Sequence, residues 1–180
     1  MIEGYAIVFN QKSRIMYDRE RKRFFTEIIK NGSVTEELLR SCDIKAVLEH
    51  NKQRLLARYN KGGGSLSLEI NDYGLLYRFL SPNTVDGDFA VEMISRGDIF
   101  GSSFAYYADE KDKSKVEYTM DNGMLLRTVH KIDLIDDISP VIDPAFFGTD
   151  VSVRSIEGIE ATLNPDRDYL IHIQELEKLI

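Results

Sequence analysis

Short apolar runs, separated by turn-forming residues, recur along most of this 180-residue chain. Runs of four to eight residues that are rich in β-branched and aromatic side chains are typical of β-strands. We expect strands at 4–9, 44–49, 65–70, 75–80, 125–134, 135–142 and 151–154, and one that carries a serine pair and ends near 107. Residues 24–30 are expected to form a short strand or a turn. Residues 108–122 are highly charged and are expected to form an exposed loop. Prolines limit the 135–142 strand to an edge or an end of its sheet.

Three segments carry helix signals. Ser33 and Glu36 match a capping box, which predicts a short helix to about residue 40. A second helix is expected after the loop at 81–84, with helically spaced apolar residues and Gly97 at its end. In the tail, Asn164 and Pro165 suit a helix start, and apolar residues then repeat every three or four positions to the end of the chain.

These elements predict an α+β domain, a strand-dominated small β-barrel flanked by helices. We expect this domain to span residues 1–156, followed by a linker and an amphipathic helix at 157–180. The apolar stripe of that helix either packs on its own domain, which is the simpler interpretation, or pairs with another copy of the chain.

Composition argues against several classes of partner. The net charge of −7 is opposite to the basic face that nucleic-acid-binding domains present. No apolar run approaches the roughly 18 residues that a membrane-spanning helix needs, and the N-terminus has no signal-peptide pattern. The single cysteine, Cys42, excludes an intrachain disulfide and fits a reducing compartment.

The stretch 97–106 places two adjacent serines between a glycine and an aromatic run. On a strand, Ser102 and Ser103 point to opposite faces, so one can face a cleft while the other packs internally. A serine becomes a nucleophile only when a base accepts its proton, and that base usually needs a third group to orient it.

Two histidines are candidates for this base. His50 lies at the end of an apolar strand, and His130 lies in a later one. The orienting group could be Asp133, Asp136 or Asp137. The scattered histidines show no close ligand pairing and argue against a metal site, and the glycine triplet at 62–64 does not match a phosphate-binding loop.

Six sequence motifs, in their order along the chain, resemble those of the prohead proteases of tailed phages, a family similar to herpesvirus assemblin. The match runs from residue 4 to about residue 154. It comprises the opening strand at 4–9, a Glu-x-Ile-x-Pro-Gly element at 27–32 with asparagine for proline, an Asn-His-Asp/Asn motif at 49–51, a Gly-Leu hairpin at 72–75, the serine motif at 97–106, and an acidic-Val-Ser-x-Val…Pro-Ala-Tyr element at 137–146. The resemblance therefore covers nearly the whole chain except the tail.

The resemblance also assigns roles to individual residues. The family's Ser-Phe-Gly-Phe aligns with residues 103–106, which selects Ser103 as nucleophile, although Ala105 replaces the glycine. It implies His50 as the base and Asp137 as the third member. Because assemblin uses a second histidine at the third position, His130 or Asp133 is the alternative.

The resemblance implies a serine endopeptidase that cleaves capsid and scaffold proteins, and itself, inside the immature phage head in the host cytoplasm. The gene would belong to a phage or a prophage. The resemblance implies no metal and no organic cofactor. It also suggests contact between copies through the C-terminal helix, because assemblin-like enzymes gain activity on dimerising. The alternative function is a capsid assembly or scaffold protein that keeps the fold and has lost proteolysis.

Overall fold

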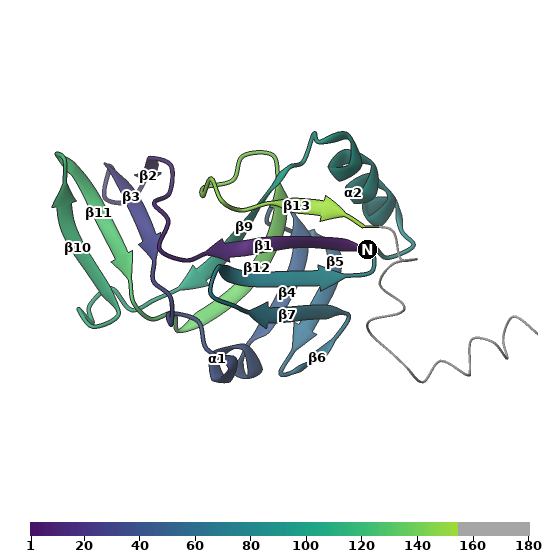
Figure 1. Cartoon of the computed structure of the whole chain (residues 1–180), viewed down its shortest axis with the longest axis horizontal. Helices are drawn as coiled ribbons and strands as arrows, with labels where there is room; N and C mark the ends of the chain where they lie inside the picture. The colour runs from purple at the N-terminus through teal and green to yellow at the C-terminus, as the bar shows by residue number, and fades with distance from the viewer. Residues whose placement is uncertain (155–180) are drawn as a thin grey trace, which may run out of the picture.

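The computed structural model describes residues 1–154, so the helix expected at 164–180 lies outside the described part of the chain. Within residues 1–154 the chain is mostly β, with two helices and three sheets. Figure 1 shows two of these sheets stacked on each other and the third extending from one end. The described strands thus form a strand-dominated α+β fold, as the sequence predicts.

A five-stranded sheet carries the residues of interest. Its strands, in spatial order, are β6 (Gly63–Gly64), β5 (Asn51–Asn60), β4 (Asp43–Leu48), β12 (Leu134–Val141) and β9 (Gly101–Tyr107). β12 runs parallel to β4 and antiparallel to β9. The strand between residues 134 and 141 is therefore central in its sheet, and Pro140 is tolerated because it lies at the end of the strand.

A four-stranded sheet packs against one face of this first sheet. It consists of β13 (Val151–Val153), β1 (Ile2–Val8), β8 (Gly74–Phe79) and β7 (Leu66–Ile70). Apolar side chains from both sheets are fully buried between them, including Ile7, Leu75 and Ile138. The two sheets are also joined by a buried hydrogen bond between the Tyr77 and Ser102 hydroxyls (2.8 Å).

The third sheet extends from the left end of the molecule in Figure 1. It contains β10 (Val116–Asp121), β11 (Met124–Val129), β3 (Arg23–Ile29) and β2 (Met16–Asp18). The buried Glu27 of β3 accepts a hydrogen bond from the Tyr106 hydroxyl of β9 (2.7 Å) and pairs with Arg127 of β11. This buried polar cluster ties the extending sheet to the strand that carries the serine pair.

The two helices have different capping groups. In α2 (Val85–Arg96), the Thr84 side chain accepts from the Gly87 amide, and Gly97 ends the helix in the left-handed conformation that the sequence predicts (φ 79°). In α1 (Glu36–Ser41), the N-cap is Thr35, whose hydroxyl accepts from the Leu38 amide. The expected capping role of Ser33 is therefore wrong.

The expected barrel is not formed, because the strands of residues 1–154 divide into three sheets that do not close. Closure would require the edge strand β9 to pair with a strand of the second sheet. The loop before β13 instead contacts this strand: the Ser102 amide donates to Thr149 Oγ1 (3.4 Å), and the Ser102 hydroxyl donates to the Asp150 carbonyl (2.7 Å). These contacts replace a continuous backbone ladder.

Besides the short strands β2 and β6, two longer strands form where the sequence pattern predicts none. The residues of β5 do not alternate between apolar and polar, and most of its side chains are exposed. β10 lies within the expected exposed loop at 108–122 and pairs along its whole length with β11. Both β5 and β10 are strands because their backbones hydrogen-bond to a neighbouring strand, although their side chains show little of the apolar alternation that predicts a strand.

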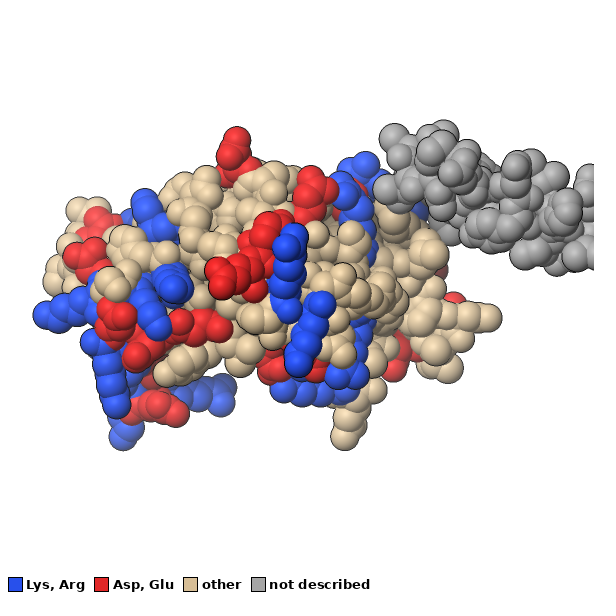
Figure 2. Space-filling view, turned by 90° about the horizontal axis from the view of Figure 1, so that it is seen from below, with Lys and Arg blue, Asp and Glu red and all other residues tan. Residues whose placement is uncertain are grey.

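Charged side chains of both signs are mixed on the face shown in Figure 2, most densely toward the end formed by the third sheet. Neither described helix is long and apolar enough to cross a membrane.

Candidate active site

Ser102 and Ser103 have opposite environments, as expected for neighbours on a strand. Ser102 is completely buried, and its hydroxyl is used twice: it accepts from Tyr77 and donates to the Asp150 carbonyl. Ser103 is partly exposed on the other face of β9, where its Oγ lies 2.9 Å from His50 Nε2. Only Ser103 therefore has both a neighbouring base and access from solvent.

His50 is held in a tight turn between β4 and β5. Glu49 and His50 form the two central residues, Leu48 pairs with Asn51, and both central residues have positive φ (52° and 54°). Two-residue turns of this kind favour asparagine and glycine, and a left-handed conformation costs other residues about 1–2 kcal/mol each. Glutamate is poorly suited to this conformation, so contacts with other parts of the fold are needed to stabilise the turn.

Three hydrogen bonds fix this turn to the end of β12. The Glu49 amide donates to the Pro140 carbonyl (3.2 Å), and the Glu49 carboxylate accepts from the Ile142 amide (2.7 Å). The His50 amide donates to Ser139 Oγ (3.1 Å). Strained backbone of this kind is concentrated at functional sites, and here it directs the imidazole toward β12 and β9.

Asp137 lies on the other side of the imidazole. Its Oδ1 is 2.6 Å from His50 Nδ1, and its side chain is almost completely buried. A carboxylate at Nδ1 fixes the tautomer that carries a proton on this nitrogen, which leaves the lone pair of Nε2 facing the Ser103 hydroxyl. The structure thus brings Ser103, His50 and Asp137 into one hydrogen-bonded chain.

The register between β12 and β9 sets the face on which Asp137 lies. Ile135 pairs with Tyr106 and Asp137 pairs with Ala105, so Asp136 is an extra residue without a counterpart on β9. Directly paired residues share a face of the sheet, and a shift of one residue would turn a side chain to the opposite face. Asp137 pairs with Ala105 and Ser139 with Ser103 in regular register, so Asp137 lies on the same face as Ser103. The bulge at Asp136 brings Leu134, beyond it, to that face as well.

Ser139 is a fourth polar residue at this site, and the sequence analysis did not single it out. It pairs directly with Ser103 across the two strands. Its fully buried hydroxyl accepts from the His50 amide and donates to Asp137 Oδ1 (3.0 Å). The only sequence signal was its place in the Asp-Ile-Ser-Pro-Val element, two residues after Asp137.

The other candidates for the third position interact elsewhere. Asp133 accepts from Lys115 Nζ (2.7 Å) and from the Asp109 amide (3.0 Å), and the lysine hydrogen bond lowers the pKa of Asp133. Asp136 binds Lys52 (2.6 Å), whose hydrogen bond lowers the pKa of that carboxyl. Both carboxylates are therefore stabilised in their charged form by lysines, away from the imidazole.

His130 does not join the site either. Its Nε2 lies 3.6 Å from a Glu117 carboxylate oxygen, and its side chain is well exposed. His172 lies outside the described residues. Within residues 1–154, no cluster of three or more His, Cys, Asp or Glu side chains could hold a metal ion.

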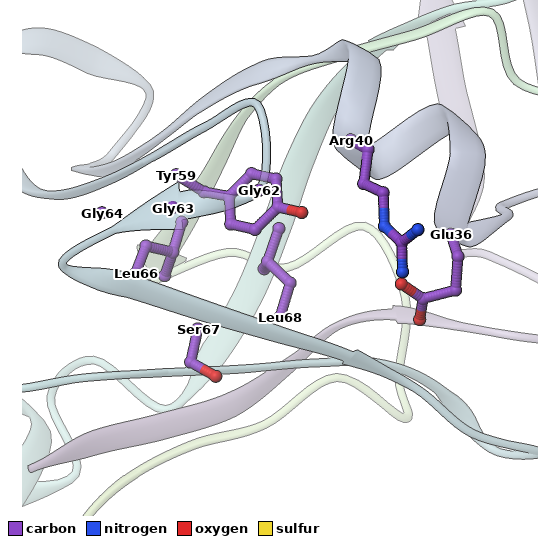
Figure 3. Close-up of a pocket in the computed structure, with 9 residues that line it drawn as sticks. All are labelled: Glu36, Arg40, Tyr59, Gly62, Gly63, Gly64, Leu66, Ser67 and Leu68. Carbon is purple, nitrogen blue, oxygen red and sulfur yellow. The ribbon is translucent and has the colours of Figure 1, made fainter.

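The pocket in Figure 3 is separate from this site. It lies between α1 and the strands β5 to β7, with Arg40 and Glu36 on the helix side and Tyr59, Leu68 and the glycines on the strand side. Its lining residues are Glu36, Arg40, Tyr59, Gly62, Gly63, Gly64, Leu66, Ser67 and Leu68. Ser103 and its hydrogen-bonded partners are not part of this lining.

The short hydrogen bond between His50 Nδ1 and Asp137 should be visible without any substrate. We expect a proton resonance downfield of the amide region in the NMR spectrum, because a strong hydrogen bond to a carboxylate deshields the Nδ1 proton. Asp137→Ala should remove this resonance, and the control His130→Gln should retain it. Loss of the resonance in His130→Gln, with retention in Asp137→Ala, would contradict the assignment.

The comparisons with known proteins agree with the family that the motifs indicate. Residues 1–164 match the family model described as Caudovirus prohead serine protease, which is most of the chain. A search of curated proteins returned no match. The family match includes the turn with His50, the strand with Ser103 and the strand with Asp137. The chain belongs to the caudovirus prohead serine protease family.

Proposed function

We propose that this chain is an active serine endopeptidase in which Ser103 is the nucleophile, His50 the general base and Asp137 the orienting carboxylate. The observation that carries the proposal is the unbroken hydrogen-bonded chain through one imidazole, from Ser103 Oγ at 2.9 Å to Asp137 Oδ1 at 2.6 Å. Both distances lie within the range required for proton transfer between a nucleophile and its base.

The chemistry follows from this order of groups. Ser103 Oγ attacks the carbonyl carbon of the scissile peptide bond while His50 Nε2 accepts the hydroxyl proton. The imidazolium then donates that proton to the leaving amine as the C–N bond breaks, which leaves an acyl-enzyme. Water, deprotonated by the same imidazole, hydrolyses the ester and regenerates Ser103. Asp137 stabilises the imidazolium during both steps.

The family match supports a capsid maturation role. We propose that the substrates are the major capsid protein and its scaffold segment, and that the enzyme also cleaves itself. These reactions would take place inside the phage prohead in the host cytoplasm. The alternative is an inactive assembly protein with the same fold. It is less well supported, because a protein that does not cleave peptides has no need to keep a serine, a histidine and a carboxylate in hydrogen-bond contact.

Replacement of Ser103 should abolish cleavage, whereas replacement of its neighbour should not. We expect Ser103→Ala to lower cleavage of a co-expressed capsid precursor by at least roughly 10⁴-fold, because the nucleophile is lost. Ser102→Ala is the matched control. It should retain activity within about tenfold but lower the free energy of unfolding by about 1–3 kcal/mol, because the Tyr77 hydroxyl loses its buried partner.

Precursor processing is read on gels, and stability is read from urea melts of the purified variants. Normal processing by Ser103→Ala would contradict the proposal. Full loss of processing by a folded Ser102→Ala protein would contradict the choice between the two serines.

Ser139 is proposed as a positioning residue, because it contacts both His50 and Asp137 but not the reacting atoms. Ser139→Ala should lower kcat roughly tenfold to a hundredfold, the effect of losing a hydrogen bond to a charged group. KM should change little, because the hydroxyl does not face the substrate. Ser139→Thr, which keeps the hydroxyl, should recover part of kcat. If Ser139→Ala and Ser139→Thr lose the same fraction of kcat, and that loss follows their loss of stability, the role of Ser139 is purely structural.

A further inference from the structure

One face of the β9–β12 pair extends from the proposed nucleophile to an exposed apolar pair. Ser103, Ala105 and Tyr107 alternate along β9 and therefore share a face. Leu134 of β12 pairs directly with Tyr107, so their side chains lie next to each other on that face. Tyr107 is 58% exposed and Leu134 is 45% exposed, so the two form an apolar surface that solvent can reach.

The surroundings of Ser103 leave room for an extended polypeptide along β9, from Ser103 toward Tyr107. His50 approaches Ser103 from the β4 and β12 side, so a peptide carbonyl must approach over β9. At the opposite end of the strand face, Pro144 covers Gly101 so closely that a Cβ there would lie 2.4 Å from the proline Cγ. Toward Tyr107, the intervening side chain is only the methyl group of Ala105.

The distance between Ser103 and Tyr107 predicts which substrate residue would contact the apolar pair. Four residues of extended chain, at roughly 3.3 Å per residue, span about 13 Å from Ser103 to Tyr107. The apolar pair also lies on a well-ordered end of the sheet, because the Asp133 amide donates to the Tyr107 carbonyl (2.9 Å) and Asp133 is itself held by Lys115. A substrate side chain three to five residues from the cleaved bond would therefore meet a fixed apolar surface.

We propose that Tyr107 and Leu134 form a subsite that selects a large apolar side chain, such as Leu, Ile, Val, Met or Phe, about four residues from the scissile bond. This inference depends on the proposed function, since it places the substrate relative to Ser103. The occupant is the substrate polypeptide and not a second copy of the chain, because the apolar pair continues the same face that carries the nucleophile.

The test separates the subsite from the catalytic proposal. A library of peptides from digested bacterial protein is incubated with the full chain, and cleaved bonds are identified by mass spectrometry. A fluorophosphonate reagent, which phosphonylates an activated serine with loss of fluoride, reports on Ser103 without using the subsite. We compare the wild type with Tyr107→Ser, Leu134→Ser and their double variant. Tyr107→Phe keeps the ring, and Leu80→Ser, at another exposed apolar position, is the matched control.

We expect the wild-type sites to be enriched in large apolar residues at one position three to five residues from the cleaved bond. The double variant should lose this enrichment and cleave the preferred peptides roughly tenfold more slowly, which is typical of an apolar subsite. Its labelling by the fluorophosphonate should stay within about twofold of wild type. Tyr107→Phe and Leu80→Ser should retain both properties.

Several results would overturn the subsite. One is rapid labelling of Ser103 with no apolar enrichment in that window, which would leave the catalytic proposal intact. Another is a double variant that keeps the wild-type preference but sediments with a lower mass, because the pair would then lie between copies of the chain. Absence of both labelling and cleavage would remove the catalytic proposal and the subsite with it.

Discussion

The pairing of β12 with its two neighbours is the constraint on which the site depends. On one side β4 leads into the turn that carries His50, and on the other side β9 carries Ser103. β12 itself supplies Asp137 and Ser139. Residues from three separate parts of the sequence thus meet on one sheet face, and hydrogen bonds between adjacent strands set their spacing. Sites built on regular strands are held more precisely than sites on loops.

The turn at Glu49 and His50 and the bulge in β12 are irregular features of this sheet that flank the site. The bulge follows Ile135, and its extra residue Asp136 directs its carboxylate to Lys52 and Lys45. The left-handed turn at Glu49 and His50 is unfavourable by itself. Contacts with Ser139, Pro140 and Ile142 stabilise it. The strained turn is therefore stabilised by the same strand that orients the His50 imidazole.

Local patterns predicted much of the fold but not its assembly. Alternation along β9 indicated that Ser102 and Ser103 face opposite ways, which is a property of any single strand. The choice between His50 and His130, and among Asp133, Asp136 and Asp137, depends on which strands are neighbours. The register that places Asp137 on the face of Ser103 exists only relative to β9, so no spacing in the sequence reveals it. The resemblance to a known family indicated His50 and Asp137 instead, because it compares the order and spacing of several motifs at once.

The expected barrel failed for a related reason. Strand-rich sequences are compatible with both closed and open sheets, and closure depends on how the edge strands pair. Here side-chain and backbone groups of Thr149 and Asp150 bind Ser102 at the edge of β9. Polar strands such as β5 were missed because their exposed side chains give no alternating pattern, although backbone hydrogen bonds define them.

The central claim is that Ser103 and His50 act as one unit, and a double-mutant cycle tests it most directly. Cleavage rates of one peptide are measured for wild type, Ser103→Ala, His50→Ala and the double variant, all with verified folding. Residues that act as a unit give strongly non-additive losses. We predict that the double variant is no slower than either single variant. A double variant whose loss equals the product of the two single losses would contradict the account, because the two side chains would then act independently.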